Sequence, residues 1–304
     1  MMRRHEAPIG IDLGSAGLGA VQLGPRGRSV EAAIELPRRG DGLDLNGEIA
    51  RLVRVMARQG FRDGPVIVGL PDHDVTVAEL TLPTASSGAP LDDIVAAQLA
   101  RICQADPSTL ECGWWATDAT SATATTRSLA AAVPWSVADS IAEAFDRAGL
   151  EVAAMEARPL AIARACRMIA QPGLEVVIDR SAPLPIMIVL ERQEVSYVRP
   201  FTRPAARTGI DETPQALSVE AFLAELRLTL GYLSHRHPTE SVARILLAGS
   251  ERDLMPISET LTYTWDLPGE MLRLDGLAQL PERLGCGGPG LVPALGLALR
   301  GRAA

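Results

Sequence analysis

Short runs of apolar residues alternate with small and polar residues at the start of the chain, and this pattern predicts β-strands. Residues 9–24 form a predicted strand, a turn of small residues and a second strand, and residues 29–36 form a third strand-like run. A helical period follows and ends at Gly60, which stands where a C-cap belongs; its apolar stripe consists of Ile49, Leu52, Val53 and Met56. The apolar run 66–71 predicts one more, buried strand.

The composition of residues 84–90 predicts a loop, and the segment that follows has elements of its own. The elements are a helix with Val95, Leu99, Ile102 and Cys103 on one face, strands near 112–117 and 128–134, a helix that Ser136 begins and Gly149 closes, and a strand at 150–155. We therefore expect a module inserted into the first part of the chain.

The opening pattern recurs in the second part of the chain. Ile178-Asp179-Arg180-Ser181 matches Ile11-Asp12-Leu13-Gly14 position for position, and each copy is followed by two strand-like runs and later a long helix. Ser218 is the expected cap of the second long helix. The repeat predicts two similar α/β halves and one insertion, with four segments: a first half at 1–83, an inserted subdomain at 84–157, a connecting helix at 158–172 and a second half at 173–304.

Composition and charge restrict the possible functions. The formal charge is −8 and all 29 basic residues are arginine, so no lysine is present to act as a nucleophile or to bind phosphate. The acidic balance and 4% aromatic content argue against a nucleic-acid partner. Four separated cysteines without a CxxC pair favour a reduced, cytosolic protein with no metal site, and no apolar run is long enough to span a membrane.

Several short stretches stand in an order that carries a resemblance: Gly10-Ile11-Asp12-Leu13-Gly14-Ser15, Val68-Gly69-Leu70-Pro71, Ala131-Ala132-Val133-Pro134, Leu247-Ala248-Gly249 and Ala294-Leu295-Gly296-Leu297-Ala298-Leu299-Arg300. In this order they resemble the actin, Hsp70 and hexokinase group, and more narrowly PilM and its cell-division relative FtsA. The resemblance covers nearly the whole chain. It implies a duplicated, actin-like (ribonuclease H-like) bilobed α/β fold with an inserted α/β subdomain in the first half.

In such folds, turns from both halves hold the phosphates of a nucleotide. The resemblance assigns this role to Asp12, Gly14 and Ser15 in the first turn, Asp179 and Ser181 in the second, and Gly249 and Ser250 on the adenosine side. This chain departs from the pattern at Gly19, where relatives have a lysine, and at Ser181 and Ser250, where they have glycine. Pro183 and Pro185 add two positions without an N–H, and only residues 202–218 stand where relatives have a lid subdomain.

These departures predict a vestigial nucleotide site with no catalytic residue, and either no cofactor or weakly bound Mg-ATP. Asp12 and Asp179 have two interpretations, local turn hydrogen bonds or a residual contact to phosphate or Mg²⁺. An active ATPase or sugar kinase, in which either aspartate serves as Mg²⁺ organiser or base, is the alternative from the enzyme class. A self-assembling, FtsA-like cytoskeletal protein is the third possibility.

The resemblance further implies a cytoplasmic scaffold of a type IV pilus or type II secretion machine, attached to the inner membrane through a partner. That partner would be the cytoplasmic tail of a PilN-like bitopic protein, with other platform proteins and assembly ATPases nearby. We expect its groove within residues 66–160. Trp114 and Trp115 are the candidate contacts, since neighbours on a strand face opposite sides, and one indole can be core while the other is an exposed anchor.

Overall fold

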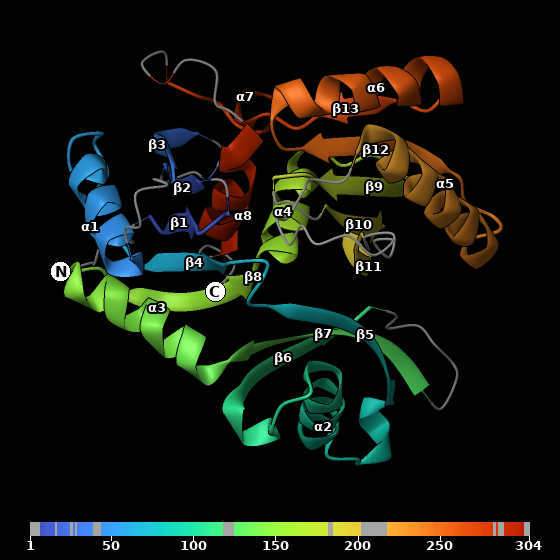
Figure 1. Ribbon diagram of the computed structural model, residues 1–304, viewed down its shortest axis with the longest axis horizontal. Helices are drawn as coiled ribbons and strands as arrows, with labels where there is room; N and C mark the ends of the chain where they lie inside the picture. Colours follow the sequence, from blue (N-terminus) through green and yellow to red (C-terminus); the bar gives the residue numbers. More distant parts are fainter. Residues whose placement is uncertain are drawn as a thin grey trace, which may run out of the picture.

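The computed structural model describes residues 7–300 except for 16, 25–26, 28, 39–43, 118–124, 182–184, 202–217, 282–283 and 285–288. Its two halves each contain a five-stranded sheet, and the sheets have the same topology (Figure 1). In the first sheet the order is β3 (Val30–Pro37), β2 (Gly17–Leu23), β1 (Ile9–Asp12), β4 (Val66–Leu70) and β8 (Val152–Ala157). In the second it is β11 (Glu194–Pro200), β10 (Ile186–Glu191), β9 (Leu174–Asp179), β12 (Val242–Ala248) and β13 (Gly269–Met271).

The strand pairings repeat between the two sheets. Three strands form an antiparallel meander in each sheet, and the central strand, β1 or β9, pairs in parallel with β4 or β12 on its other side. The duplication and the bilobed α/β fold class expected from the sequence are therefore confirmed.

Two central helices lie between the sheets in Figure 1, namely α4 (Arg158–Cys166) and α8 (Val292–Arg300). They belong to a core cluster that contains residues of both sheets. Gly296 allows their backbones to meet, because a Cβ at this position would lie 1.7 Å from the Ala161 carbonyl oxygen. Gly10 does the same for β1 against α8, where a Cβ would lie 2.0 Å from the Ala294 carbonyl oxygen.

The outer helices cover the sheets on their far sides. One core cluster packs the first sheet against α1 (Leu45–Met56) and α3 (Trp135–Arg147), and another packs the second sheet against α5 (Val219–Arg236) and α6 (Glu251–Trp265). The short helix α7 (Leu274–Leu277) precedes the return to α8. Ser218 caps α5 as predicted, since its Oγ accepts a hydrogen bond from the Ala221 N–H at 3.2 Å.

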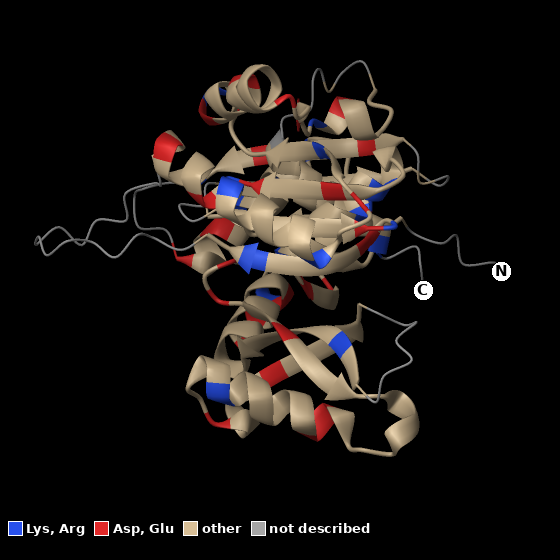
Figure 2. Cartoon of the chain, turned by 90° about the vertical axis from the view of Figure 1, so that its right-hand side faces the viewer, with Lys and Arg blue, Asp and Glu red and all other residues tan. Residues whose placement is uncertain are grey.

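The inserted module is a three-stranded sheet with one helix against it, and Figure 2 shows it below the main body. The sheet order is β5 (Thr76–Pro83), β7 (Thr125–Pro134) and β6 (Leu110–Ala116), and α2 (Leu91–Cys103) packs on one face. β5 precedes the boundary predicted at residue 84, whereas α3 and β8, which precede 158, pack with the first sheet. The exact division of the chain stays a prediction.

Two local predictions were wrong. The first helix, α1, ends at Met56 with Ala57 as its C-cap, and not at Gly60. The sequence suggested that Ser136 caps the N-terminus of the helix now seen as α3, but this helix begins at Trp135 and its N-cap is Pro134, without a side-chain hydrogen bond. Ser136 therefore lies inside the first turn. The predicted C-terminal end is confirmed, because Gly149 has a φ of +78° and the Leu150 N–H donates to the Phe145 carbonyl at 3.0 Å.

Candidate functional site

The two duplicated turns meet in a cleft between the halves. Asp12 ends β1 and Asp179 ends β9, and both side chains are buried. A cavity of about 510 Å³ is lined at this place by residues of all three predicted turns: Asp12, Gly14, Ser181, Gly249 and Ser250. Ser15 lies beside them, and its Oγ donates to the Ser181 carbonyl at 3.4 Å. The structure thus brings the candidate site residues together.

A residue that the sequence did not single out, Arg158, lies at the centre of this cleft. Its Nε donates to both carboxylate oxygens of Asp12 at 3.0 and 3.1 Å, and its Nη1 donates to Asp72 Oδ2 at 3.1 Å. The same Nη1 also bonds Asp179 Oδ2. The Arg158 side chain is 3% exposed, so one buried guanidinium joins three carboxylates from both halves.

Burial has the largest single effect on the pKa of Asp12, Asp72 and Arg158. It raises the pKa of Asp12 to about 6, although the Arg158 charge acts in the opposite direction. Burial also raises the pKa of Asp72. Burial disfavours the charged form of Arg158 too, but the carboxylates of Asp12, Asp179 and Asp72 outweigh this effect and raise the pKa of Arg158 above its ordinary value. Arg158 therefore stays cationic, and its charge is balanced by the three carboxylates of the same chain.

Hydrogen-bond donors in the two turns that follow β1 and β9 also have partners within this chain. The Ser181 N–H and Oγ both donate to Asp179 Oδ1, at 3.0 and 2.6 Å. The Arg180 N–H donates to the Ala248 carbonyl at 2.7 Å, and the Leu13 N–H donates to the Gly69 carbonyl at 3.2 Å. Backbone N–H groups hold phosphates only when they point at the ligand unpaired.

The rest of the cleft lining is acidic. It carries Glu35, Glu251 and Asp253 in addition to Asp12, against the two guanidiniums of Arg158 and Arg180. Burial raises the pKa of Glu35. Gly19, for which the resemblance predicts a lysine, lines the cleft, and a Cβ there would lie 3.1 Å from the Gly290 carbonyl oxygen. Pro183 and most of the predicted short lid fall outside the described residues. In the described ranges, no group of three His, Cys, Asp or Glu residues is placed to hold a metal ion.

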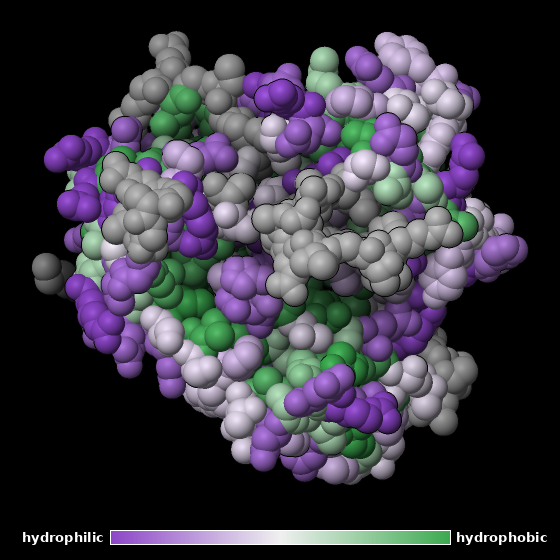
Figure 3. All heavy atoms as spheres, in the orientation of Figure 1, coloured by the Kyte–Doolittle hydropathy of each residue, from purple (hydrophilic) through white to green (hydrophobic). Residues whose placement is uncertain are grey.

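A second cavity of about 600 Å³ separates the inserted module from the main body. Figure 3 shows apolar side chains gathered where these two parts meet. The walls include residues 111–115 of β6, residues 131–133 of β7, residues 155–157 of β8 and one side of α4. Glu194, Val195 and Arg300 contribute as well. We call this cavity the groove. It lies mainly within the predicted range 66–160.

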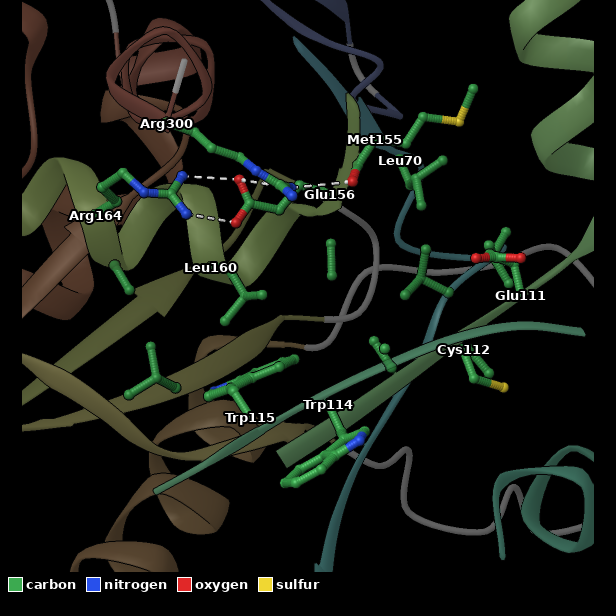
Figure 4. A pocket seen from close by; sticks show the side chains of 18 of the residues that line it. Leu70, Glu111, Cys112, Trp114, Trp115, Met155, Glu156, Leu160, Arg164 and Arg300 are labelled. Atoms are coloured by element: carbon green, nitrogen blue, oxygen red, sulfur yellow. Dashed lines mark hydrogen bonds and ion pairs between the residues drawn. The ribbon is translucent and has the colours of Figure 1, made fainter. Parts of the chain in front are cut away.

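The two tryptophans take different positions in the groove (Figure 4). Trp115 packs against the large core cluster between the halves. Trp114 packs with the core of the inserted module, and its Nε1–H donates to Asp92 Oδ1 of α2 at 2.8 Å. Both side chains are half-buried, and both contribute to the lining.

Ion pairs fix the wall opposite the tryptophans. Arg164 donates to both carboxylate oxygens of Glu156, at 2.8 and 2.5 Å, and to the Gly296 carbonyl at 3.0 Å. Arg300 donates to the Met155 carbonyl at 3.1 Å. Leu160 lies between these polar groups and the tryptophans in Figure 4. The groove thus combines apolar surface with a rigid, charged wall.

β6 is an edge strand, and the pairing register shows which of its backbone groups point outward. The Thr117 N–H donates to the Arg127 carbonyl at 3.0 Å, which marks a hydrogen-bonded pair. Because such pairs alternate along an antiparallel ladder, the main-chain groups of Cys112 and Trp114 point away from β7, toward the outer edge of the sheet. Gly113 between them is exposed, and a Cβ there would meet no atom within 4 Å.

No family model matches the sequence, and no curated protein matches it. Among solved structures, a chain of the PilM–PilN type IV pilus biogenesis complex is similar, with a TM-score of 0.73 and 18% identity over 98% of this chain and 99% of that chain. A Bacteroides thetaiotaomicron protein with an actin-like ATPase fold and unknown function is also similar. Its TM-score is 0.54 and its identity 10%, over 92% of this chain and 96% of that chain.

The cytoplasmic domain of EpsL, an inner-membrane component of the type II secretion system of Vibrio cholerae, is also similar. Its TM-score is 0.53 and its identity 11%, over 97% of this chain and 94% of that chain. Every helix in the described residues is too short or too polar to cross a bilayer. The chain therefore has the actin-like ATPase fold, and its likeness to a PilM–PilN complex chain extends over nearly its full length.

Proposed function

We propose that this protein is an actin-like scaffold of a type IV pilus or type II secretion assembly platform. Its groove binds the cytoplasmic tail of a PilN-like bitopic inner-membrane protein, and this contact holds the scaffold on the cytoplasmic side of the membrane. The single observation that carries the proposal is the groove between the inserted module and the main body, in a fold similar to a chain of the PilM–PilN complex. Other platform proteins and the assembly ATPases are the proposed further partners.

The walls of the groove suit an extended peptide. The outward main-chain groups of Cys112 and Trp114 can pair with the backbone of an added strand, as in other complexes in which a peptide joins a sheet edge. The Trp115 and Leu160 side chains offer apolar contacts next to this edge. A Trp in a well-packed pocket commonly supplies much of the binding energy.

We propose further that the scaffold works without nucleotide turnover. The residues of the cleft do not fit a magnesium nucleotide: Arg158 fills the space between Asp12 and Asp179, and the turn donors Ser181 N–H and Arg180 N–H are already paired. The sequence has no lysine to neutralise phosphate, and the cleft lining is acidic. No step of the proposed function is assigned to a nucleotide.

Gly113 offers a direct test, because it lines the groove and a Cβ there would meet no atom within 4 Å. The probe is the cytoplasmic tail peptide of a PilN-like bitopic protein from the same organism, and its binding is measured by fluorescence anisotropy. We expect the unmodified protein to bind the peptide with a Kd below about 100 μM, which corresponds to a binding free energy of about −5.5 kcal/mol. The Gly113→Leu variant should have a Kd at least tenfold higher. Absence of binding at that concentration would refute the proposal.

The matched control is Gly231→Leu. Gly231 is an exposed glycine of α5, and a Cβ there also meets nothing within 4 Å. This variant should bind the peptide like the unmodified protein. Thermal unfolding with and without Mg-ATP addresses the alternative ATPase or kinase function: a bound nucleotide at 100 times its Kd stabilises by roughly 2.7 kcal/mol, whereas the scaffold should show no shift.

A further inference from the structure

We propose that Arg158 is a built-in latch that holds the two halves closed across the cleft, so that the closed form needs neither a metal ion nor a nucleotide. In this chain the guanidinium takes the central position, and its partners come from both sides. Asp12 ends β1 and Asp72 follows β4 of the first sheet, and Asp179 ends β9 of the second.

The latch is specific to an arginine. The planar guanidinium offers several donors in fixed directions, and Arg158 uses Nε toward Asp12 and Nη1 toward Asp72 and Asp179. A lysine is a single compact charge and cannot reach the three carboxylates in the same way. Removing the cation altogether leaves three buried carboxylates together, and an uncompensated buried charge is strongly destabilising.

A second contact across the cleft supports closure. Ser15 of the first turn donates from Oγ to the Ser181 carbonyl of the second turn at 3.4 Å, so the two turns touch directly. Ser181 is itself held by Asp179, through its N–H and its hydroxyl. The latch and the two turns thus form one connected network from Arg158 to Ser15.

The latch also connects the cleft with the groove, and this part rests on the proposed function. Arg158 is the first residue of α4, and Leu160, Ala163 and Arg164 of the same helix line the groove. Movement of the halves about the cleft would therefore move one wall of the groove. Permanent closure keeps that wall in place whatever the nucleotide level.

Two variants test the latch. Arg158→Ala removes the cation. Asp179→Asn removes only the charge of the second half: its side-chain oxygen can still accept from Ser181, and the Arg158 pair with Asp12 remains, so this variant is expected to fold. For both we expect a larger radius of gyration in small-angle X-ray scattering and about tenfold faster amide exchange at the ends of β1 and β9. Ethylguanidinium should reverse both changes in Arg158→Ala.

The matched control is Arg244→Ala. Arg244 is also buried, and its carboxylate partners Glu175 and Glu270 both belong to the second sheet; it donates besides to the Ile169 carbonyl at 2.6 Å, shortly after α4. This variant should exchange faster in the second half and keep the radius of gyration of a closed molecule. Unchanged scattering and exchange at β1 and β9 in Asp179→Asn would overturn the latch. A wild-type protein that becomes more compact on addition of Mg-ATP would overturn it as well. Neither measurement uses the partner peptide, so failure of the latch can be told apart from failure of the proposed binding in the groove.

Discussion

Replacement of Gly296 by alanine should strongly destabilise the protein, although alanine is the better helix former. Gly296 lies in the middle of α8, where glycine costs about 1 kcal/mol relative to alanine in an exposed helix. A Cβ at this position would lie 1.7 Å from the carbonyl oxygen of Ala161 and 2.4 Å from its carbonyl carbon. These are main-chain atoms of α4, so no side-chain rotation can relieve the clash.

The magnitude follows from the separation that the clash demands. An ordinary carbon–oxygen contact requires the helices to move apart by about 1.5 Å, and a gap of even 0.5–1 Å forfeits about a quarter to a half of the contact energy of the facing atoms. Seven of nine residues are buried in each helix, so most of their contacts are affected. Overpacking of this kind costs about 1–3 kcal/mol, and we expect about 3 kcal/mol after the gain in helix propensity.

The assay is urea unfolding followed by circular dichroism, with Gly231→Ala as the matched control. Gly231 is also inside a helix, but a Cβ there meets no atom within 4 Å, so this variant should gain about 0.5–1 kcal/mol. The two identical substitutions should therefore shift stability in opposite directions. A Gly296→Ala protein as stable as the unmodified one would contradict the close approach of α4 and α8.

Three further outcomes are expected. Because the proton of Asp12 is held more tightly in the folded chain, with a pKa of about 6 against an ordinary value of 3.8, stability relative to Asp12→Asn should fall by roughly 3 kcal/mol in all as pH rises from about 3 to about 7 and then level off; urea unfolding across this range checks it, and a rise would contradict it. Burial raises the pKa of Cys166 to about 12, so iodoacetamide should label Cys103 and Cys112 in the native protein and Cys166 only after unfolding, as read by mass spectrometry. Ser218→Ala removes the cap of α5 and should lower the unfolding free energy by about 1 kcal/mol, whereas an unchanged urea midpoint would show that the cap is dispensable.

The duplicated strands were predictable because each is a short apolar run next to a turn, and burial on both faces requires such runs. Helix α6 was not predicted. It contains Pro256, a residue that normally breaks a helix, and many of its other positions are polar. Leu254, Ile257 and Leu261 nevertheless bury one side of it against the second sheet, and this packing outweighs the local signal.

The centre of the cleft shows a different limit. Asp12, Asp72 and Asp179 lie 146, 86 and 21 positions from Arg158 in the sequence, so only the folded chain brings them together. The aspartates that end β1 and β9 could be found because they repeat in matching positions. Arg158 has no counterpart in the repeat and no motif around it, and its local sequence predicts only the start of a helix.

The edge of β6 that faces away from β7, which pairs with no strand in the described residues, can also join the molecule to other chains. Outward N–H and C=O groups, here those of Cys112 and Trp114, accept any extended chain, including a second copy of the same protein. If the proposed function holds, a bound tail that covers this edge would also act as a protective cap. The protein made without its partner should then associate with itself as its concentration rises, and co-expression with the bitopic tail should keep it monomeric.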